Sequence, residues 1–426
     1  MAAPAGVGAV TIRELGPGDD LGAVFDLAQR AFGPTSRAGR EAWQADAESV
    51  IRDRRYLAAF DGSRMVAAAR YHDMIQWWQG RGLPMAGAAG VTVAPEDRSR
   101  GVGRALTRAL LGMIAERGYP VSVLYPATMA IYRSLGWEIA GTRDTVVIPA
   151  RSLRSLVAPD PWLGGPVDAI GPDATGPDTA GPDAGPGLRR CGPQDAAEVL
   201  AVTSGVHQAL RDSGPNTRDE ATVRGWLGDE NRYAYLAPDG FLAYRWQHGT
   251  DEILVERALA GSAATTRALW AIVASHSSMA EAVRCHLGPA DPVRWLIREP
   301  DLAMARPLPW MLRVVDAAAA VAGRGFPPAS AVAARLRLAD AVCPGNDGLW
   351  TLEVGEGHGV LTREPDSAAA AGAAPLALGA RGFAALFAGT PVATLRRAGL
   401  AAGGDPGRDA VLDGAFAASP FLLDHF

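Results

Sequence analysis

The sequence predicts an α/β and α+β protein, with two mixed-sheet α/β domains in tandem and a C-terminal α+β domain. Three observations lead to this prediction. Strand and helix patterns alternate over residues 1–150. The alternation returns over residues 188–303, after a stretch of Gly, Pro and Asp in residues 151–187. From residue 304 to residue 426 the pattern changes to groups of helices and groups of strands.

Composition narrows the class of protein. The 426 residues suffice for two or three domains, and the formal net charge is −5. With no basic tract, this charge argues against nucleic acid as a partner. The three cysteines lie far apart, which predicts neither a disulfide framework nor a zinc site and favours the cytoplasm. The seven histidines show no metal-ligand spacing, and no segment predicts a secretory leader or a membrane span.

The first domain begins with a strand in AVTIREL, followed by helices near residues 20–32 and 37–53. A strand–turn–strand hairpin follows over residues 56–71. It has Asp61-Gly62 at its turn, a dipeptide typical of type I′ turns. Further strands are expected to complete a mixed sheet: 84–93, 121–125 and 138–148.

The most informative stretch of this domain is RSRGVGRAL, residues 98–106. It lies between a β-rich run that ends at Val93 and a helix whose apolar spacing begins at Val102. Its two glycines let a ligand approach the main chain, and its three arginines add charge to the positive end of the helix. The combination predicts an anion site that would take a phosphate.

Two common phosphate motifs do not fit this stretch. A Walker A loop requires Gly-Lys-Ser or Gly-Lys-Thr, and the chain contains no lysine, since all 41 basic residues are arginine. The dinucleotide fingerprint requires a third glycine where this chain has Leu106. The remaining pattern is Arg-x-x-Gly-x-Gly over residues 98–103, and a plain Gly/Arg turn is its alternative interpretation.

A second motif follows the helix. The run VSVLYP predicts a strand, and MAIYRSLGW, residues 129–137, predicts a short helix that ends before Gly136. Tyr132 lies in this helix. By itself it would be interpreted as a core tyrosine on an amphipathic turn, but its position after the glycine loop favours a functional role.

The segments after residue 150 are each interpreted separately. Residues 151–187, with their Gly-Pro-Asp repeat, predict an extended or disordered linker.

In the second domain, YAYLAPDGFLAYRW predicts a hairpin turning at Asp239-Gly240, and Val255–Leu259 leads into a helix over Thr265–His276. No Arg-x-x-Gly-x-Gly lies between them, so we expect this domain to serve as a scaffold. In the third domain, PWMLRVVDAAAAVAGRGF predicts a helix, RLRLADAV and LWTLEVGEGHGVLTRE predict strands, and residues 377–417 show helical patterns.

The loop resembles the pyrophosphate loop of the GCN5-related N-acetyltransferases (GNAT), and nearly the whole chain resembles the Eis (enhanced intracellular survival) family. That family joins an active GNAT domain, a GNAT-like domain without catalysis and a sterol-carrier-protein-like domain. The resemblance implies acetyl-coenzyme A as cosubstrate, with these contacts: Val91, Thr92, Val93, Ser99, Arg100, Gly101, Val102, Gly103, Arg104, Ala127 and Thr128.

The resemblance also implies a chemistry. Tyr132 would face the thioester sulfur as general acid, and the terminal carboxylate of Phe426 would be the general base. Members of the family acetylate amines of aminoglycosides and lysine side chains and assemble as hexamers. His425 stands where the family often has an acidic residue, which leaves the charge of the amine pocket open. Asp26 and Glu41 are further candidates for that pocket, with exposed helix carboxylates as the alternative.

The predicted function is therefore an acetyl-coenzyme A-dependent N-acetyltransferase. A non-catalytic protein that binds coenzyme A or lipid is the alternative from another class.

Overall fold

A computed structural model describes residues 10–156, 187–297, 303–365 and 374–426. The chain divides into two compact units. Unit 1 comprises Met1–Gly141, Pro309–Pro420 and His425–Phe426, and unit 2 comprises Thr142–Leu308 and Phe421–Asp424. Two long strands, β6 (Glu138–Pro149) and β13 (Ala303–Val314), have residues in both units.

The N-terminal part of unit 1 is a mixed sheet with helices on both faces. Its strands, apart from β6 and β13, are β1 (Thr11–Glu14), β2 (Tyr56–Asp61), β3 (Arg64–Trp78), β4 (Arg81–Val93) and β5 (Val121–Leu124). Its helices are α1 (Leu21–Phe32), α2 (Arg37–Arg52), α3 (Val102–Glu116) and α4 (Met129–Arg133). Neighbouring strands run antiparallel except β4 and β5, which are parallel.

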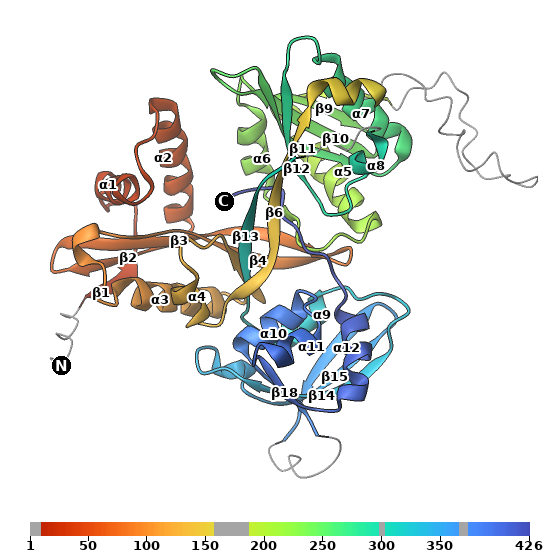
Figure 1. The fold of residues 1–426 in the computed structure, drawn as a ribbon. Coiled ribbons are helices and arrows are strands. Elements are labelled where there is room, and N and C mark those ends of the chain that lie inside the picture. The colour runs from red at the N-terminus through yellow and green to blue at the C-terminus, as the bar shows by residue number, and fades with distance from the viewer. Residues whose placement is uncertain (1–9, 157–186, 298–302, 366–373) are drawn as a thin grey trace, which may run out of the picture. The chain divides into compact units, whose positions relative to one another are not determined.

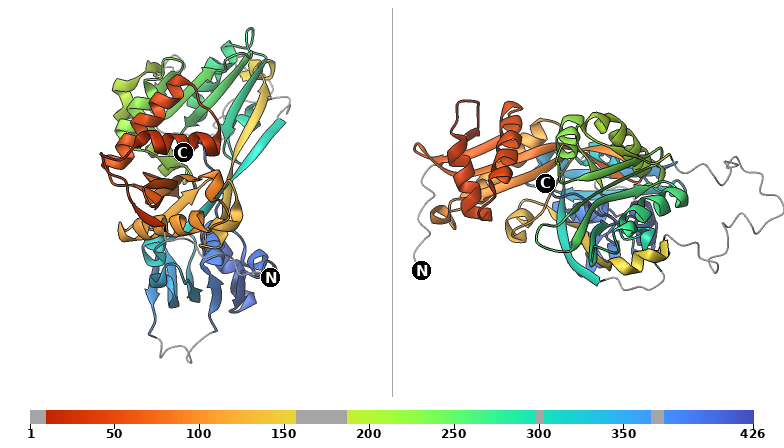
Figure 2. Two further views of the ribbon diagram at one scale, coloured as in Figure 1. Left: turned by 90° about the vertical axis from the view of Figure 1, so that its left-hand side faces the viewer. Right: turned by 90° about the horizontal axis from the view of Figure 1, so that it is seen from above.

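The sheet separates two apolar clusters. Helices α1 and α2 cover one face, where Val24, Leu27 and Val50 pack on β2 and β3, and α3 and α4 cover the other (Figures 1 and 2). Local signals set the helix starts. At the start of α1, Asp20 accepts a hydrogen bond from the Gly22 N–H at 2.8 Å. At the start of α2, Ser36 accepts a hydrogen bond from the Gly39 N–H at 3.1 Å. Both expected helices are thereby confirmed.

The two predicted hairpins exist, but their turns differ from the prediction. Between β2 and β3 the central residues are Gly62 and Ser63, and only Gly62 has a positive φ, of 63°. This pattern belongs to a type II′ turn rather than the expected type I′. In the second hairpin Pro238 and Asp239 form the turn, and Gly240 lies inside a strand, where an added Cβ would be 2.8 Å from the Leu259 carbonyl oxygen.

The C-terminal part of unit 1 is an α+β layer with a five-stranded sheet in the order β16-β15-β14-β17-β18. The strands are β14 (Val332–Ala339), β15 (Gly348–Gly355), β16 (His358–Arg363), β17 (Leu376–Gly379) and β18 (Ala401–Gly403). The helices are α9 (Ala317–Gly323), α10 (Ala380–Phe387), α11 (Val392–Arg397) and α12 (Asp409–Phe416). Only the β14–β17 pairing is parallel.

The segment PWMLRV, predicted to be helical, is the end of β13 instead. Residues 311–314 pair antiparallel with β5, and the helix begins only at Ala317. Trp310, Met311 and Leu312 are completely buried, so this apolar run fills a strand that is covered on both faces. Residues 309–312 are a short apolar run that carries no period, and the sequence pattern therefore could not separate strand from helix.

A buried ion pair joins the two parts of unit 1. Arg313 on β13 donates to both carboxylate oxygens of Asp340, which follows β14, at 2.7 and 2.6 Å. The two residues are 1% and 4% exposed. Asp340 also accepts hydrogen bonds from the N–H groups of Val342 and Cys343. This fully satisfied carboxylate ties the strand next to β5 to the five-stranded sheet.

The strands of unit 2 follow one another in a mixed sheet in the order β6-β12-β11-β10-β9-β7. Besides β6, its strands are β7 (Arg189–Cys191), β8 (Asn216–Thr217), β9 (Tyr233–Ala237), β10 (Gly240–Trp246), β11 (Glu252–Ala260) and β12 (Ala282–Leu287). Its helices are α5 (Ala196–Ala209), α6 (Glu220–Leu227), α7 (Ala263–Ser275) and α8 (Val293–Leu296). The parallel pair β11 and β12 flanks α7 as β4 and β5 flank α3.

The predicted linker begins with ordered structure. Ala150–Leu156 form a 3-10 helix, and Leu153 and Leu156 are buried in the apolar cluster of unit 2. Residues 151–156 are therefore wrongly predicted as linker, because their two leucines at i and i+3 are core positions. The Gly-Pro-Asp repeat itself lies outside the described residues. Among the described helices, none has the length and apolar character that crossing a membrane requires.

The Arg313–Asp340 pair generates a stability prediction. Asp340→Ala leaves a buried guanidinium without its partner, and we expect the free energy of unfolding to fall by about 3–5 kcal/mol. The control is Glu41→Ala, which removes an exposed ion pair with Arg37 and should change the free energy by less than about 1 kcal/mol. Equilibrium urea unfolding measures both. If the two substitutions lower the free energy of unfolding equally, the buried Arg313–Asp340 pair does not have this stabilising role.

Candidate active site

The site forms where β4 and β5 separate. The strands pair in parallel from Met85 with Val121 to Gly87 with Val123, and pairing stops there. β4 continues to Val93, with a bulge in its pairing to β3 near Gly90, whose φ is +60°. We call the diverging segments 88–93 and 124–128 the β4–β5 fork. A bulge re-aims the strand, and the fork leaves main chain on its rim for a ligand.

The predicted phosphate loop lies directly after β4. Gly101 has φ +80° and precedes the first residue of α3, and Ser99 also adopts a left-handed conformation, with φ +63°. No side chain caps this helix, and no described residue accepts a hydrogen bond from the N–H groups of residues 99–104. A run of unpaired amides at a helix start, with a left-handed residue beside it, is an anion-binding arrangement.

An acidic residue that the sequence analysis missed holds this loop. Asp97, 2% exposed, accepts hydrogen bonds from Arg64 at 2.7 and 3.1 Å and also pairs with Arg100. Arg100 contacts Asp61 as well, at 3.3 Å. The hydrogen bonds from Arg64 and Arg100, against the effect of burial, keep the pKa of Asp97 below its usual range. The Arg100 side chain thus braces the loop, while Arg98 and Arg104 are exposed.

The glycines of the loop have different roles. Gly101 has the left-handed conformation that glycine adopts without strain. Gly103 is buried, and an added Cβ would lie 3.2 Å from Val93 Cγ2 and 3.4 Å from Ile131 Cδ1. From the sequence, Gly103 was expected only to let a ligand approach the main chain. The structure adds close packing of α3 against β4 and α4.

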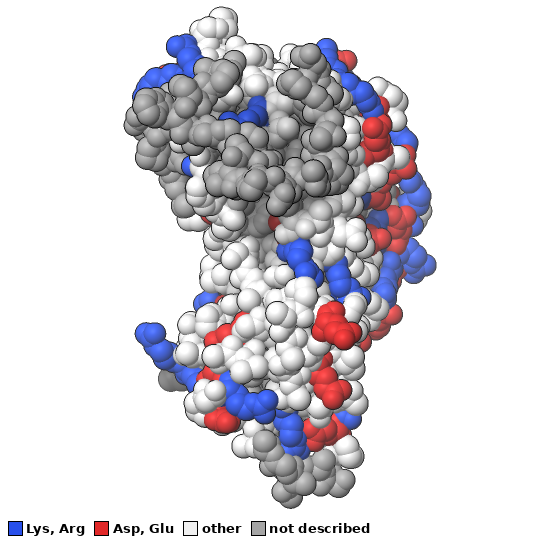
Figure 3. All heavy atoms as spheres, turned by 90° about the vertical axis from the view of Figure 1, so that its right-hand side faces the viewer, with Lys and Arg blue, Asp and Glu red and all other residues white. Residues whose placement is uncertain are grey.

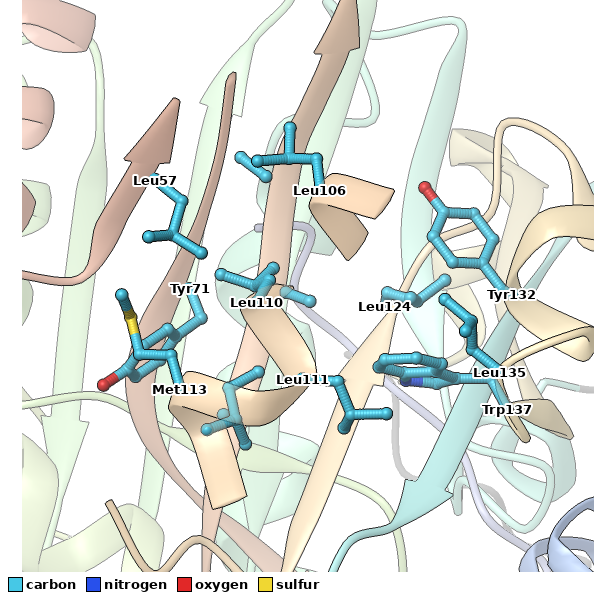
Figure 4. Packing of buried hydrophobic residues seen from close by; sticks show 14 of the residues in the cluster. Leu57, Tyr71, Leu106, Leu110, Leu111, Met113, Leu124, Tyr132, Leu135 and Trp137 are labelled. Atoms are coloured by element: carbon cyan, nitrogen blue, oxygen red, sulfur yellow. The ribbon is translucent and has the colours of Figure 1, made fainter. Parts of the chain in front are cut away.

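Tyr132, on α4, lies with its ring in the apolar cluster under the fork. It is 6% exposed, and its ring meets that of Trp137 edge-on, with centroids 6.2 Å apart. Figure 4 shows the hydroxyl oxygen at the end of the ring that points away from Trp137. Burial raises the pKa of Tyr132 to about 12, so the phenol stays protonated at any ordinary working pH.

The last two residues lie at the same fork. The His425 ring stacks on Tyr125, with centroids 4.6 Å apart and an interplanar angle of 18°. The Phe426 ring is 5.5 Å from Tyr125, and a Cβ added to Gly87 would be 2.9 Å from its Cε2 atom. Gly87 is the last β4 residue paired with β5. Tyr125, which no sequence pattern singled out, therefore contacts both terminal rings.

The remaining candidates divide into two groups. Thr92 is buried and donates to the Ala68 carbonyl oxygen at 3.3 Å, and Ala127 and Thr128 are exposed immediately before α4. Asp26 and Glu41 each pair with an arginine on their own helix, at 2.8 and 3.0 Å, and are largely exposed. These two carboxylates therefore fit the alternative of exposed helix residues.

The equivalent helix of unit 2 begins differently. Ser262 precedes α7, and its hydroxyl accepts the hydrogen bond from the Thr265 N–H at 3.2 Å. The side chain occupies the place that an anion takes at an uncapped helix. This capped start agrees with the expectation that the second domain has no coenzyme loop.

Comparisons with known proteins agree with the fold. Models of the acetyltransferase (GNAT) domain match residues 11–140 and 214–314, and a model of the sterol carrier protein domain matches residues 317–422. The N-acetyltransferases Eis of Mycobacterium tuberculosis and Mycobacterium bovis are 30% identical over 372 residues, which cover 83% of this chain and 84% of theirs.

Solved structures are similar over almost the full length. A GCN5-related N-acetyltransferase from Kribbella flavida is 40% identical and covers 99% of both chains, with a TM-score of 0.86. Eis1 from Mycobacterium abscessus, 22% identical over 98% of this chain and 100% of its own, shares the fold with a TM-score of 0.72.

Two matches to the GNAT domain, together with the Eis relatives, define this protein as a GNAT-type N-acetyltransferase. The alternative of a non-catalytic binding protein is not retained. Within that class, the chain belongs to the Eis family.

The class determines the cosubstrate. GNAT acetyltransferases use acetyl-coenzyme A, and the unpaired amides of residues 99–104 suit its diphosphate. In the part of the chain that the structure describes, no group of three or more His, Cys, Asp or Glu residues could hold a metal ion. On the face drawn in Figure 3, basic and acidic side chains are interspersed over the described residues.

The loop geometry predicts a loss of coenzyme affinity. Arg98 is exposed and has no ion-pair partner among the described residues, so it is available to a phosphate. Arg98→Ala should weaken coenzyme A binding by about 1.5–3 kcal/mol, the scale of a charge-assisted hydrogen bond. Arg108→Ala, an exposed arginine farther along the same helix, is the control. The affinities are measured by calorimetric titration. If both variants bind coenzyme A with the native affinity, Arg98 does not contact the coenzyme and the loop has only a structural role.

Proposed function

We propose that this enzyme transfers the acetyl group of acetyl-coenzyme A to primary amines, either of aminoglycoside-like polyamines or of lysine side chains. The observation that carries the proposal is the position of Phe426 at the β4–β5 fork, beside Tyr125 and Gly87. The fork is bordered by the phosphate loop on one side and by the segment leading to Tyr132 on the other.

Binding of the cosubstrate would use main chain more than side chains. The N–H groups of Ser99 to Arg104 would hold the diphosphate, and the edge of β4 at Val91 to Val93 would hydrogen-bond the extended arm of the coenzyme. Ala127 and Thr128 would contact the coenzyme on the other side of the fork. Because Arg100 is engaged with Asp97, its contribution would be to hold the amides in place.

The base in this proposal is the α-carboxylate of Phe426. A substrate ammonium must lose a proton before its nitrogen can attack the thioester carbon, and the carboxylate would accept that proton. The reference pKa of an α-carboxyl group is only about 3.3–3.7, so a proton relay through water or partial burial would support the transfer. Phe426 is half-buried, with its ring held against Tyr125.

The acid in this proposal is the Tyr132 phenol. When nitrogen attacks the carbonyl carbon and the carbon–sulfur bond breaks, negative charge develops on sulfur. The phenol would donate a hydrogen bond to that sulfur and release its proton as the charge builds. Because burial raises its pKa to about 12, this donation would be coupled to bond cleavage rather than precede it.

Other features of the proposal come from the family resemblance. We propose on this ground that the enzyme assembles as a hexamer and is cytoplasmic, and that its substrates are aminoglycoside-like or lysine amines. His425 is stacked on Tyr125 and brings an imidazole where an acidic residue is common, so we expect the preference among polyamines to differ from that of relatives with an acid there. Release of free thiol from acetyl-coenzyme A, across a panel of polyamines and lysine peptides, tests the activity. If no amine leads to release of thiol, the proposed acetyltransferase activity on amines is contradicted.

Tyr132→Phe tests the acid. The substitution keeps the ring and its contact with Trp137 while removing the proton. We expect kcat to fall about 10²–10⁴-fold, the usual size of an acid–base contribution, with little change in melting temperature. Steady-state kinetics and thermal unfolding measure the two effects. A lower melting temperature with native kcat would assign Tyr132 to the core alone.

The position of the terminal carboxylate tests the base. Deleting Phe426 moves the carboxylate by one residue, about 3.5 Å, and a C-terminal peptide tag converts it to an amide. Both changes should lower kcat by at least about 10²-fold with coenzyme affinity preserved. Phe426→Leu, which keeps the carboxylate in register, and the same tag at the N-terminus are the controls. A C-terminally tagged protein that mass spectrometry finds uncleaved, yet acetylates at the native rate, would exclude this base.

A further inference from the structure

Four charged side chains form a closed ring beside the phosphate loop. Arg64 donates two hydrogen bonds to Asp97, at 2.7 and 3.1 Å, and Asp97 also pairs with Arg100. Arg100 contacts Asp61 at 3.3 Å, and the Asp61 Oδ2 atom lies 3.9 Å from Arg64 Nη2. Carboxylates and guanidinium groups alternate, so each charge has an opposite charge on either side. We call these four residues the charge ring.

The charge ring joins the phosphate loop to the β2–β3 hairpin. Asp61 is the last residue of β2, and Arg64 is the first residue of β3. Asp97 ends a 3-10 helix, Pro95–Asp97, that leads from β4 into the loop, and Arg100 belongs to the loop itself. The turn of a hairpin that is distant in sequence therefore supports the loop through side chains.

Asp97 holds the centre of the charge ring. It is 2% exposed, whereas the side chains of Arg64 and Arg100 are 50% and 35% exposed. The N–H groups of residues 99–104 donate to no described residue, so main-chain hydrogen bonds give this part of the loop little support. Ser99 has φ +63°, a conformation that persists only where surrounding contacts hold it. The contact of Arg100 with Asp97 is such a contact, directly after Ser99.

We propose that Asp97 is a positioning residue for the cosubstrate, which acts through Arg100 and the hairpin turn to hold the amides of residues 99–104 in the arrangement that fits a diphosphate. The inference rests on the proposed function, because it needs this loop as the diphosphate site. It adds the β2–β3 turn to the groups that determine coenzyme affinity. It also means that a preference for donors that carry phosphate depends on Asp97.

The sign of the effect separates positioning from simple electrostatics. A carboxylate beside an anion site repels the anion, so removing its charge strengthens diphosphate binding if the loop keeps its shape. If Asp97 instead holds Arg100 in place, removing its charge releases the loop and weakens binding. The two explanations therefore predict opposite changes in affinity for the same substitution.

Asp97→Asn makes this test, because it keeps the shape of the side chain and removes its charge. We expect the dissociation constant of coenzyme A, measured by calorimetric titration, to rise about 10–100-fold, the scale of a charge-assisted hydrogen bond. If Asp97→Asn binds coenzyme A with the native affinity or more tightly, Asp97 does not position the loop.

Glu96→Gln is the matched control. It removes the same charge one residue earlier, from a side chain that is 52% exposed and pairs with Arg30 at 3.0 Å and with Arg64 at 3.5 Å. We expect its dissociation constant for coenzyme A to stay within about threefold of native, because exposed ion pairs contribute little. A loss of affinity as large as that of Asp97→Asn would show that the charge ring has no special role.

A donor without phosphate separates positioning from a general loss of structure. S-Acetylpantetheine has the thioester and the pantetheine arm of the cosubstrate but no phosphate group. We expect Asp97→Asn to lower kcat/KM for acetyl-coenzyme A about 10–100-fold and to keep kcat/KM for S-acetylpantetheine within about threefold of native. Equal losses with the two donors would make Asp97 a structural residue only.

Asp61→Asn examines the hairpin side of the charge ring. The Asp61 side chain is 43% exposed at a turn, so the fold tolerates the change. We expect the dissociation constant of coenzyme A to rise about three- to tenfold, less than in Asp97→Asn, because Arg100 keeps its contact with Asp97. A dissociation constant at or below the native value would exclude the hairpin turn from the coenzyme site.

Thiol release separates this inference from the proposed function. If the native enzyme releases no thiol with any amine while Asp97→Asn weakens coenzyme A binding, the proposed transfer fails and the positioning role stands. If the native enzyme acetylates amines while Asp97→Asn keeps the native affinity for coenzyme A, only the positioning role fails.

Discussion

The separation of β4 from β5 after Gly87 is the constraint on which the rest of the site depends. Two paired strands would satisfy each other and leave no main chain for a ligand. Because their pairing stops, the phosphate loop, the turn before α4 and the terminal rings can all lie along one opening. β5 meanwhile keeps its other edge paired, to β13, and the fork therefore forms without loss of order in the sheet.

The sequence was informative where local chemistry determines local structure. Glycines and arginines between a strand and an amphipathic helix identified the loop, and the spacing after Val102 identified α3. The sequence did not predict which strands pair when they lie far apart in the chain. β13 joins β5 across more than 180 residues of chain, and its run PWMLRV is equally compatible with a buried helix. Asp97 and Tyr125 carry no motif, because their contacts come from which side chain lies opposite them in the fold.

The two GNAT-type domains share one arrangement but differ where the helix between the two parallel strands begins. Both place a helix between two parallel strands, but α3 starts at a glycine with free amides while α7 starts at a serine that satisfies its own helix. A capped helix no longer attracts a phosphate, and so the second domain was free to acquire other contacts. Its close packing of Gly214 and Gly288 on Phe421 and its Arg257–Asp424 pair are such contacts.

The ion pairs of this enzyme share one chemical property, which is that every side-chain cation outside histidine is a guanidinium. An activated thioester is a hazard to nearby amines, and a lysine that loses its charge to an acetyl group also loses its salt bridge. Guanidinium groups, with a pKa above about 12, offer no free amine lone pair at neutral pH. The pairs at Asp97, Asp340 and Asp424 therefore contain no amine that the enzyme's own reagent could acetylate.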